Sequence, residues 1–337
     1  MTSLAWNAAA VLCLAATSAA GLLQDPAQDG GAQPARGRAA APASQGKDRP
    51  LVGALAYLWH RKEKPQEINS LTPEHQPYDT SDPATARHNI RLWKEAGVDF
   101  VAGEWWGLGP NDWYQHMTDS FENYLKLCEE EKFRICVYLD DIPGAKDHNS
   151  AEKLAKNLKV IAKWAQSPAF LRYGPSQRPL VFLYERVLQK LGKGKDNQAL
   201  EEALQPYQDE FYFVFVNVPA ESLAKREQPA GVQYYAIPFM QEPYLIEQYE
   251  AARSSPKVDL FALVFHGFDN TGHKGREGRK WPSSPEKFQH QWEIARQARP
   301  EVIMVPWDEL GEWSAYVPNK EQGDRYYKLL KEAIGKL

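Results

Sequence analysis

The stretch that decides the fold is Glu301-Val302-Ile303-Met304-Val305-Pro306-Trp307-Asp308-Glu309-Leu310-Gly311-Glu312-Trp313, near the end of the chain. An apolar run leads directly into a segment with two glutamates three positions apart. An unbroken apolar run of this length predicts a strand that is covered on both faces, as the strands of a parallel sheet are. A strand that ends in acidic side chains is typical of an α/β barrel, which collects polar residues at the carboxyl ends of its strands.

Similar apolar runs recur along the chain before this one, and longer amphipathic stretches separate them. Eight strands with helical connections predict a single (β/α)8 TIM barrel, and 337 residues with 43% hydrophobic content are enough to form one. A doubly wound open sheet is the competitor, but no glycine-rich phosphate-binding motif follows the first strand. The predicted strands are Val52–Trp59, Val98–Trp105, Phe133–Asp140, Pro179–Tyr184, Phe211–Asn217, Val232–Ile237, Val258–Phe265 and Glu301–Pro306.

The amphipathic stretches carry signals for the ends of helices. Asp82 and Pro83 supply a capping side chain and a first-turn proline, and Gly97 supplies the usual left-handed stop. Residues 220–226 form a weak helix at best. The predicted helices are Ala84–Ala96, His116–Glu131, Ala151–Gln166, Ala199–Leu204, Tyr244–Arg253, Glu286–Ala298 and Gln322–Ile334.

The amino-terminal part of the chain has a different composition. Residues 1–23 hold an Ala-rich apolar run that is too short for a membrane span, which predicts a signal peptide, although no Lys or Arg precedes the run. Residues 24–49 are rich in Gly, Pro, Ala and Gln, which predicts a disordered linker. Residues 50–337 are predicted to form the barrel domain. We therefore expect a secreted or periplasmic protein with no membrane insertion once the signal is removed.

Charge and aromatic content narrow the ligand class. The net charge of −4 does not favour nucleic acid. Eleven Trp and 16 Tyr, several of them at predicted strand ends, favour a ligand that stacks on aromatic rings, such as a carbohydrate. Cys128 and Cys136 are expected to be buried free thiols, with a bridge between them left open. No metal or organic cofactor is expected, and the sequence leaves the oligomeric state open.

The carboxyl ends of the predicted strands carry the candidate site residues, because strand ends of a barrel meet at one face. Trp105 and Trp106 are either a sugar platform or core residues, and Asp269 either contacts substrate or caps the turn at Thr271. The predicted substrate-binding residues are Tyr57, Trp59, Glu104, Trp105, Trp106, Asp141, Tyr184, Glu185, Asn217, His266, Asp269 and Asp308.

Glu309 and Glu312 are the predicted catalytic residues. Carboxylates three positions apart in a turn lie on one side of the chain, and cleavage of a glycosidic bond requires two acidic groups with different roles. The alternative is an acidic loop without chemistry, neutralised by the basic residues of the preceding loop.

Three segments, taken together and in order, resemble glycoside hydrolase family 99, the endo-α-mannosidase-like barrels. The likeness spans roughly residues 51–335. The first segment is Tyr78–Pro83 with Ala96–Phe100 and Glu104–Gly107, the second is His266–Thr271, and the third is Trp307–Glu312 with Gly323–Tyr326.

The resemblance implies a retaining mechanism in which Glu309 acts as a base on the 2-hydroxyl of the sugar and Glu312 acts as general acid and then as base. We therefore predict an endo-acting glycoside hydrolase, with an α-mannan-like glycan among the candidate substrates. The sequence departs from the family pattern at Asp308, Leu310, Gly311, Val317 and Glu104, which predicts an altered sugar or linkage. A non-catalytic carbohydrate-binding barrel and a glycosyl-transferring protein of polysaccharide biosynthesis remain the alternatives.

Overall fold

Eight parallel strands close into a barrel in the computed structural model, which describes residues 49–62, 71–146, 149–191, 198–235, 242–271 and 278–337. The strand order is β3-β2-β1-β11-β8-β7-β6-β5, and a further pairing of β3 with β5 closes the circle. The predicted (β/α)8 barrel is confirmed. Its strands are β1 (Leu51–Tyr57), β2 (Phe100–Trp105), β3 (Ile135–Leu139), β5 (Arg178–Leu183), β6 (Tyr212–Val216), β7 (Ala230–Gln233), β8 (Val258–Leu263) and β11 (Val302–Pro306).

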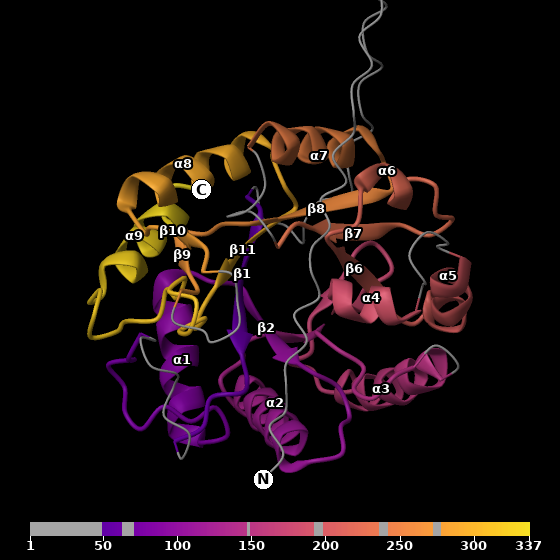
Figure 1. The fold of residues 1–337 in the computed structure, drawn as a ribbon, viewed down its shortest axis with the longest axis horizontal. Helices are drawn as coiled ribbons and strands as arrows, with labels where there is room; N and C mark the ends of the chain where they lie inside the picture. Colours follow the sequence, from indigo (N-terminus) through magenta and orange to yellow (C-terminus); the bar gives the residue numbers. More distant parts are fainter. Residues whose placement is uncertain (1–48, 63–70, 147–148, 192–197, 236–241, 272–277) are drawn as a thin grey trace, which may run out of the picture.

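The helices surround the strands in chain order, as the ring in Figure 1 shows. They are α1 (Pro83–Ala96), α2 (Asp112–Glu130), α3 (Ser150–Trp164), α4 (Glu185–Leu191), α5 (Gln198–Leu204), α6 (Ala220–Leu223), α7 (Glu242–Ser254), α8 (Pro285–Gln297) and α9 (Arg325–Ile334). Three small elements decorate the barrel. A short strand, β4 (Arg172–Tyr173), pairs antiparallel with β5, and the strands β9 (Phe268–Asp269) and β10 (Lys280–Trp281) pair with each other after β8.

Local sequence signals set the ends of α1 as predicted. The Asp82 carboxylate accepts a hydrogen bond from the Ala84 amide at 2.9 Å, and Pro83 opens the helix. Gly97 ends it with a φ of 84°, a conformation that a residue with a Cβ rarely adopts. The strand β2 can therefore begin only three residues later, and Trp93 and Ala96 pack α1 onto the barrel.

Several elements differ from the sequence predictions. The helix α2 begins at Asp112 instead of residue 116, because the Asn111 side chain caps it by accepting from the Trp113 amide at 3.1 Å. The short helix α4 was not predicted, since its seven residues give little helical periodicity. The strand β7 ends at Gln233 instead of residue 237, so that Tyr235 lies two residues beyond the end of the strand.

The two faces of β2 show which side chains enter the barrel. Side chains alternate along a strand, so neighbours face opposite sides of the barrel wall. Trp105 contacts Trp164 of α3, with 4.9 Å between the ring centroids, and therefore faces the helix layer. Glu104 then faces the barrel interior, level with Tyr57 of β1 and Tyr138 of β3.

Several predictions concern residues outside the barrel wall. Cys128 and Cys136 are buried free thiols. The predicted signal peptide and nearly all of the predicted linker lie outside the described residues. Among the residues described, no helix is long and apolar enough to cross a membrane.

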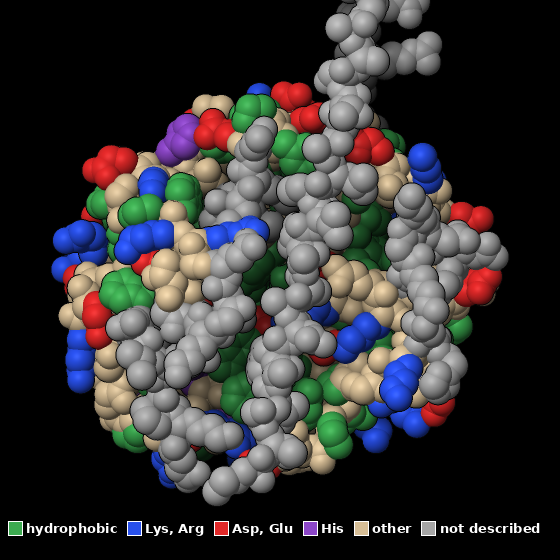
Figure 2. All heavy atoms as spheres, viewed as in Figure 1, with side chains coloured by type: hydrophobic (Ala, Val, Ile, Leu, Met, Phe, Trp, Pro, Cys, Tyr) green, Lys and Arg blue, Asp and Glu red, His purple; other side chains and the backbone are tan. Residues whose placement is uncertain are grey.

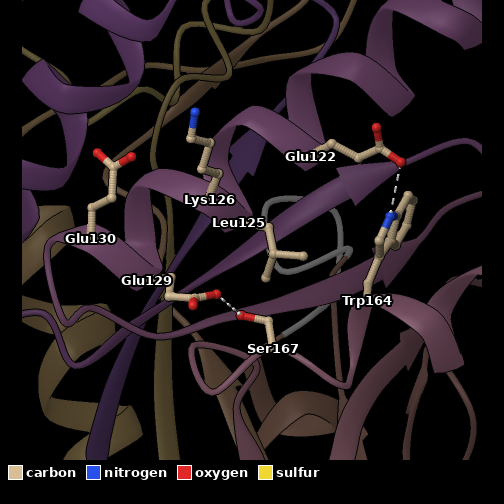
Figure 3. Close-up of a pocket in the computed structure, with 7 residues that line it drawn as sticks. All are labelled: Glu122, Leu125, Lys126, Glu129, Glu130, Trp164 and Ser167. Carbon is tan, nitrogen blue, oxygen red and sulfur yellow. Dashed lines mark hydrogen bonds between the residues drawn. The ribbon is translucent and has the colours of Figure 1, made fainter.

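A surface groove lies on the outer wall of the barrel, where α2 meets the segment that follows α3 (Figure 3). Trp164 forms part of its lining and donates a hydrogen bond to Glu122 at 3.2 Å, and Ser167 donates one to Glu129 at 2.9 Å. The groove sits at the carboxyl-terminal halves of these helices, which run toward the amino ends of the strands. It therefore lies toward the opposite end of the barrel from the strand ends that carry the candidate site residues.

Candidate active site

The segment after β11 is anchored from outside the barrel by Trp307. This indole is fully buried, and its nitrogen donates a hydrogen bond to the Asn89 side chain of α1 at 3.2 Å. Its ring packs edge-on against Trp93 with 5.7 Å between centroids. The backbone amide of Trp307 also donates to the Leu55 carbonyl at 2.7 Å. These contacts fix the direction in which the following acidic residues leave the strand.

Asp308 is fully buried, and protein donors occupy both of its carboxyl oxygens. The Tyr57 amide donates to one oxygen at 2.7 Å, and the Tyr78 hydroxyl donates to the other at 2.8 Å. Burial raises the pKa of Asp308 to about 7, although these two hydrogen bonds lower it. The predicted substrate contact is thus placed as a bridge between β1 and the segment before α1, and not in the barrel opening.

A turn after Asp308 presents the two glutamates. Leu310 is fully buried as the hydrophobic anchor of this turn, and the Ser314 amide donates to the Glu309 carbonyl at 3.3 Å. Trp313 has a φ of 54°, which reverses the chain. The Glu312 carbonyl accepts from the Asp269 amide at 2.8 Å, so the loops that follow β8 and β11 are tied together.

The charges of the two predicted catalytic residues both act on the hydroxyl group of Tyr235. Its pKa lies well above the ordinary value because of burial and because the carboxylates of Glu309 and Glu312 both act on it, with a smaller effect of Glu104. Tyr57 contacts the same hydroxyl at 2.7 Å, and its own pKa is raised by burial, Tyr235 and Glu309. The charge of Glu309 thus acts on both tyrosine hydroxyls, and the charge of Glu312 acts on that of Tyr235.

Aromatic rings form a wall beside these carboxylates. Trp59 packs against Tyr57 with 4.9 Å between centroids and edge-on against Trp106 with 5.8 Å. Tyr184 meets Tyr235 edge-on at 5.6 Å. Figure 2 shows hydrophobic and charged side chains lying together at the centre of the helix ring. We call this site the mouth, defined by Tyr57, Trp59, Glu104, Trp106, Tyr184, Tyr235, Glu309 and Glu312.

Glu104 and Asp140 form a second acidic group at the ends of β2 and β3. Both are almost fully buried, with 3% and 2% of their surfaces exposed. Arg186 of α4 forms an ion pair with Asp140 and stacks over the rings of Trp106 and Tyr184, at 4.6 and 5.1 Å from the ring centroids. The arginine thus links the acidic group to the aromatic wall.

Two predicted site residues lie in the core and not at the mouth. Trp105 is fully buried between the barrel and the helices, where its indole nitrogen donates to the Thr118 hydroxyl at 3.1 Å. His266 is also fully buried. It stacks on Tyr326 at 3.7 Å, and its Nε2 lies 3.0 Å from the Ala315 carbonyl. Burial lowers the pKa of His266 to about 3, so the imidazole is neutral at physiological pH. Both residues therefore shape the scaffold.

The Asp269 carboxylate forms hydrogen bonds within its own turn. It accepts from the Thr271 amide at 3.0 Å and hydroxyl at 2.6 Å, and it pairs with Lys280 at 2.8 Å. Burial tends to raise its pKa, but the hydrogen bonds from Lys280 and Thr271 outweigh burial and lower it. Of the two roles considered from the sequence, the structure shows the capping role.

The remaining predicted residues support the rim of the mouth. Asp141 pairs with Lys190 of α4 and caps the Ile142 amide at 2.7 Å. Asn217, with a φ of 59°, donates from its side chain to Glu185 at 2.7 Å and accepts from the Tyr235 amide at 2.8 Å. Asn217 and Glu185 thus hold the backbone of a mouth residue.

Sequence reasoning missed two residues of the site, Tyr235 and Arg186. Tyr235 was assigned to the interior of a longer strand, whereas β7 ends two residues before it. Arg186 lies in the first turn of a short helix directly after β5, and the signal that could have found it is the run Tyr184-Glu185-Arg186 at a strand end. Among the described residues no cluster of three or more His, Cys, Asp or Glu side chains is arranged to hold a metal ion.

Known structures share this architecture. The endo-α-mannosidase of Bacteroides thetaiotaomicron, in complex with bis-tris-propane, is 15% identical over 85% of this chain and 96% of its own, with a TM-score of 0.66. A second structure of that enzyme gives 16% identity, the same coverage and a TM-score of 0.65. A glycoside hydrolase-like protein is 14% identical over 86% of this chain and 94% of its own, with a TM-score of 0.66. At these identities the likeness shows the barrel fold.

Sequence comparison identifies the family. None of the curated proteins matches the chain. The profile of glycosyl hydrolase family 99 matches residues 24–201, which is more than half of the chain and includes the second strand end with Glu104 and Trp106 as well as Arg186. The match also takes in the predicted linker. The chain therefore belongs to glycosyl hydrolase family 99.

Proposed function

We propose that this protein is an exported, endo-acting glycoside hydrolase that cleaves an α-mannan-like glycan with retention, and that Glu309 and Glu312 are its catalytic pair. One observation carries the proposal: the turn after β11 holds both glutamates at the carboxyl ends of the strands, where the Glu312 carbonyl accepts from the Asp269 amide of the loop after β8 at 2.8 Å. In agreement with this placement, both carboxylates act on the hydroxyl of Tyr235 in the aromatic-lined mouth. The family match ends at residue 201, so the roles of the two glutamates rest on this geometry and on the sequence resemblance.

The proposed reaction uses the two glutamates in different protonation states. Glu309, as carboxylate, takes the proton of the sugar 2-hydroxyl, whose oxygen attacks the anomeric carbon. The bond to the leaving oxygen breaks as that oxygen takes a proton from Glu312. Water then gives a proton to Glu312 and attacks the anomeric carbon, the bond between that carbon and the 2-oxygen breaks, and the 2-oxygen regains its proton from Glu309. Two displacements at the same carbon leave the configuration unchanged.

The tyrosine hydroxyls beside the glutamates are suited to orienting this reaction. Because the pKa of Tyr235 lies well above its ordinary value, the hydroxyl keeps its proton and can donate a hydrogen bond. The Tyr57 hydroxyl, 2.7 Å away, shares in the same network. A proton donor held next to a carboxylate fixes the orientation of that carboxylate and helps to select its protonation state.

Three of the departures from the family pattern, Asp308, Leu310 and Val317, are buried, with at most 1% of their surfaces exposed. Asp308 bridges β1 and the segment before α1, and Leu310 packs beneath the turn that carries the glutamates. Both glutamates themselves are kept. Turnover is therefore favoured over the non-catalytic binding barrel.

The substrate class rests on two supports. The solved structures of the same fold include an enzyme named as an endo-α-mannosidase, and the aromatic wall offers stacking surfaces for more than one sugar ring. Export rests on the predicted signal peptide alone.

The test is hydrolysis of a glycan panel by the purified protein. We expect new reducing ends from an α-mannan and a mixture of internal fragments, as endo action produces. Release of single sugars from chain ends would contradict endo action, and binding without any release would favour the non-catalytic alternative.

The aromatic wall gives a separate prediction. Replacing Trp106 by alanine removes a ring that packs against both Trp59 and Arg186, and we expect KM to rise about tenfold or more, since stacking on an aromatic ring contributes on the order of 1 kcal/mol or more. Steady-state kinetics on the preferred glycan measure this. The matched control is Tyr244→Ala, which removes an exposed ring on α7 and should leave KM unchanged. Equal KM values for both variants would show that Trp106 does not contribute to substrate binding.

A further inference from the structure

Each carboxyl group of the acidic pair Glu104 and Asp140 has partners within the protein. One oxygen of Glu104 accepts a hydrogen bond from the Trp106 indole nitrogen at 2.9 Å. Asp140 shares a side-chain hydrogen bond with Glu104 and forms an ion pair with Arg186. Glu104 has 3% of its surface exposed and Asp140 has 2%.

The hydrogen bond between the two carboxyl groups requires a proton. Two carboxylates cannot hydrogen-bond to each other, so one group of the pair must be the acid and the other the carboxylate. Arg186 pairs with Asp140, which stabilises the negative charge there. The proton is therefore assigned to Glu104, which donates to Asp140 and accepts from Trp106.

The pKa shifts agree with this assignment. Burial and the neighbouring charge of Asp140 hold the pKa of Glu104 well above its usual range, and Arg186 and Trp106 only partly oppose them. Burial raises the pKa of Asp140 to about 6, while Arg186 lowers it. The other titratable groups whose charges act on this pair or that lie next to it are Tyr57, Tyr138, Asp141, Tyr184, Tyr235 and Glu309.

We propose that Glu104 is a positioning residue that works as a neutral carboxylic acid, holding the Trp106 ring directly and the Arg186 guanidinium through Asp140. The proposal rests on the proposed function, because it assigns a task within the same mouth. The Trp106 and Arg186 side chains in turn contact the rest of the aromatic wall. Arg186 lies over Trp106 and Tyr184, and Trp106 packs edge-on against Trp59.

The arrangement predicts a pH limit. When Glu104 loses its proton, two carboxylates lie next to each other with one guanidinium paired to Asp140, and the hydrogen bond that joined them is lost. The positions of Arg186 and Trp106 then loosen. KM should rise on the alkaline side as Glu104 ionises, and this alkaline limb of KM is separate from the fall in kcat that ionisation of the proposed general acid Glu312 produces.

The Glu104→Gln variant distinguishes a positioning role of Glu104 from a catalytic role. A glutamine oxygen accepts from Trp106 and its amide donates to Asp140, as the protonated acid does. We expect Glu104→Gln to keep kcat/KM within about threefold at neutral pH and to extend the alkaline limb to higher pH. In the Glu104→Ser variant the side chain is too short to join both partners, and KM should rise about tenfold or more.

A loss of about 100-fold or more in kcat for a folded Glu104→Gln variant would show an ionised, catalytic carboxylate and overturn the proposal. An unchanged alkaline limb in that variant would also overturn it. Trp106→Phe provides the second variant. It removes the donor that lowers the pKa of Glu104, so its alkaline limb should move to higher pH. A limb that stays in place or moves to lower pH would contradict the assignment.

An infrared measurement tests the proton without any glycan, so a failure to find hydrolysis does not affect it. The difference spectrum of the unaltered protein minus Glu104→Gln should contain the carbonyl stretch of a protonated carboxyl group at pH 8. At that pH Asp308 is largely ionised, and a matched spectrum against Asp308→Asn shows any contribution from it. The absence of a band assigned to Glu104 would overturn the proposal.

Discussion

Replacing Glu309 by glutamine is expected to lower kcat by about a thousandfold or more, while the protein folds and still binds glycan. Glutamine has the shape of glutamate but cannot take the proton of the sugar 2-hydroxyl. Because the backbone contacts of the turn after β11 do not involve this side chain, the change should leave the turn intact. The measurements are kcat from the release of reducing ends and glycan affinity from calorimetry.

Glu312→Gln should behave differently, and the difference assigns the two roles. Without its general acid the variant should lose about as much activity on a natural glycan, but it should keep much of the first step on a substrate whose leaving group needs no proton, such as an activated aryl glycoside. Glu309→Gln should be inactive on both substrates. Glu332→Gln, on the exposed side of α9, is the matched control and should match the unaltered protein. Normal turnover by Glu309→Gln would contradict the assignment.

Asp308 should make the stability of the protein depend on pH. Its pKa is about 7 in the folded state against an ordinary value of 3.8. The folded protein therefore holds this proton more tightly than the unfolded chain does, and the free energy of unfolding falls as pH rises from about 4 through about 7. Above that range the difference corresponds to a loss on the order of 4 kcal/mol.

Urea unfolding of the unaltered protein and of Asp308→Asn, at pH 4.5, 6 and 8, measures this effect. The Asn oxygen can still accept from the Tyr57 amide but carries no titrating proton. We expect the stability of the variant, relative to that of the unaltered protein, to rise with pH across this range. The comparison cancels the contributions of groups that do not contact Asp308, such as Glu104. A constant difference between the two proteins across pH would show that Asp308 does not titrate there.

The barrel was predictable because its signals are local. Each strand is an unbroken apolar run, and caps such as Asp82 and Gly97 mark where a helix begins and ends. Strand ends follow in order, so the sequence also indicates which segments meet at the mouth. Glu104, Trp106 and the glutamates after β11 were predicted as site residues in this way.

The remaining differences concern the direction in which side chains point, which the sequence indicates poorly. A difference of one residue reverses the facing of a side chain on a strand, so Trp105 points to the helix layer while Glu104 enters the barrel. Asp308 and His266 are polar residues at strand ends, yet both are buried in the core and hydrogen-bond to other parts of the protein there. Tyr235 was missed because its strand ends earlier than the apolar run does.

The most direct test of the catalytic pair is a crystal structure of the Glu312→Gln variant with an intact oligosaccharide. The account predicts an uncleaved glycosidic bond across the mouth, with the 2-hydroxyl of one sugar against Glu309, the linking oxygen against residue 312, and the sugar rings on Trp59 and Trp106. An oligosaccharide bound elsewhere, or side chains of residues 309 and 312 turned away from it, would contradict the account.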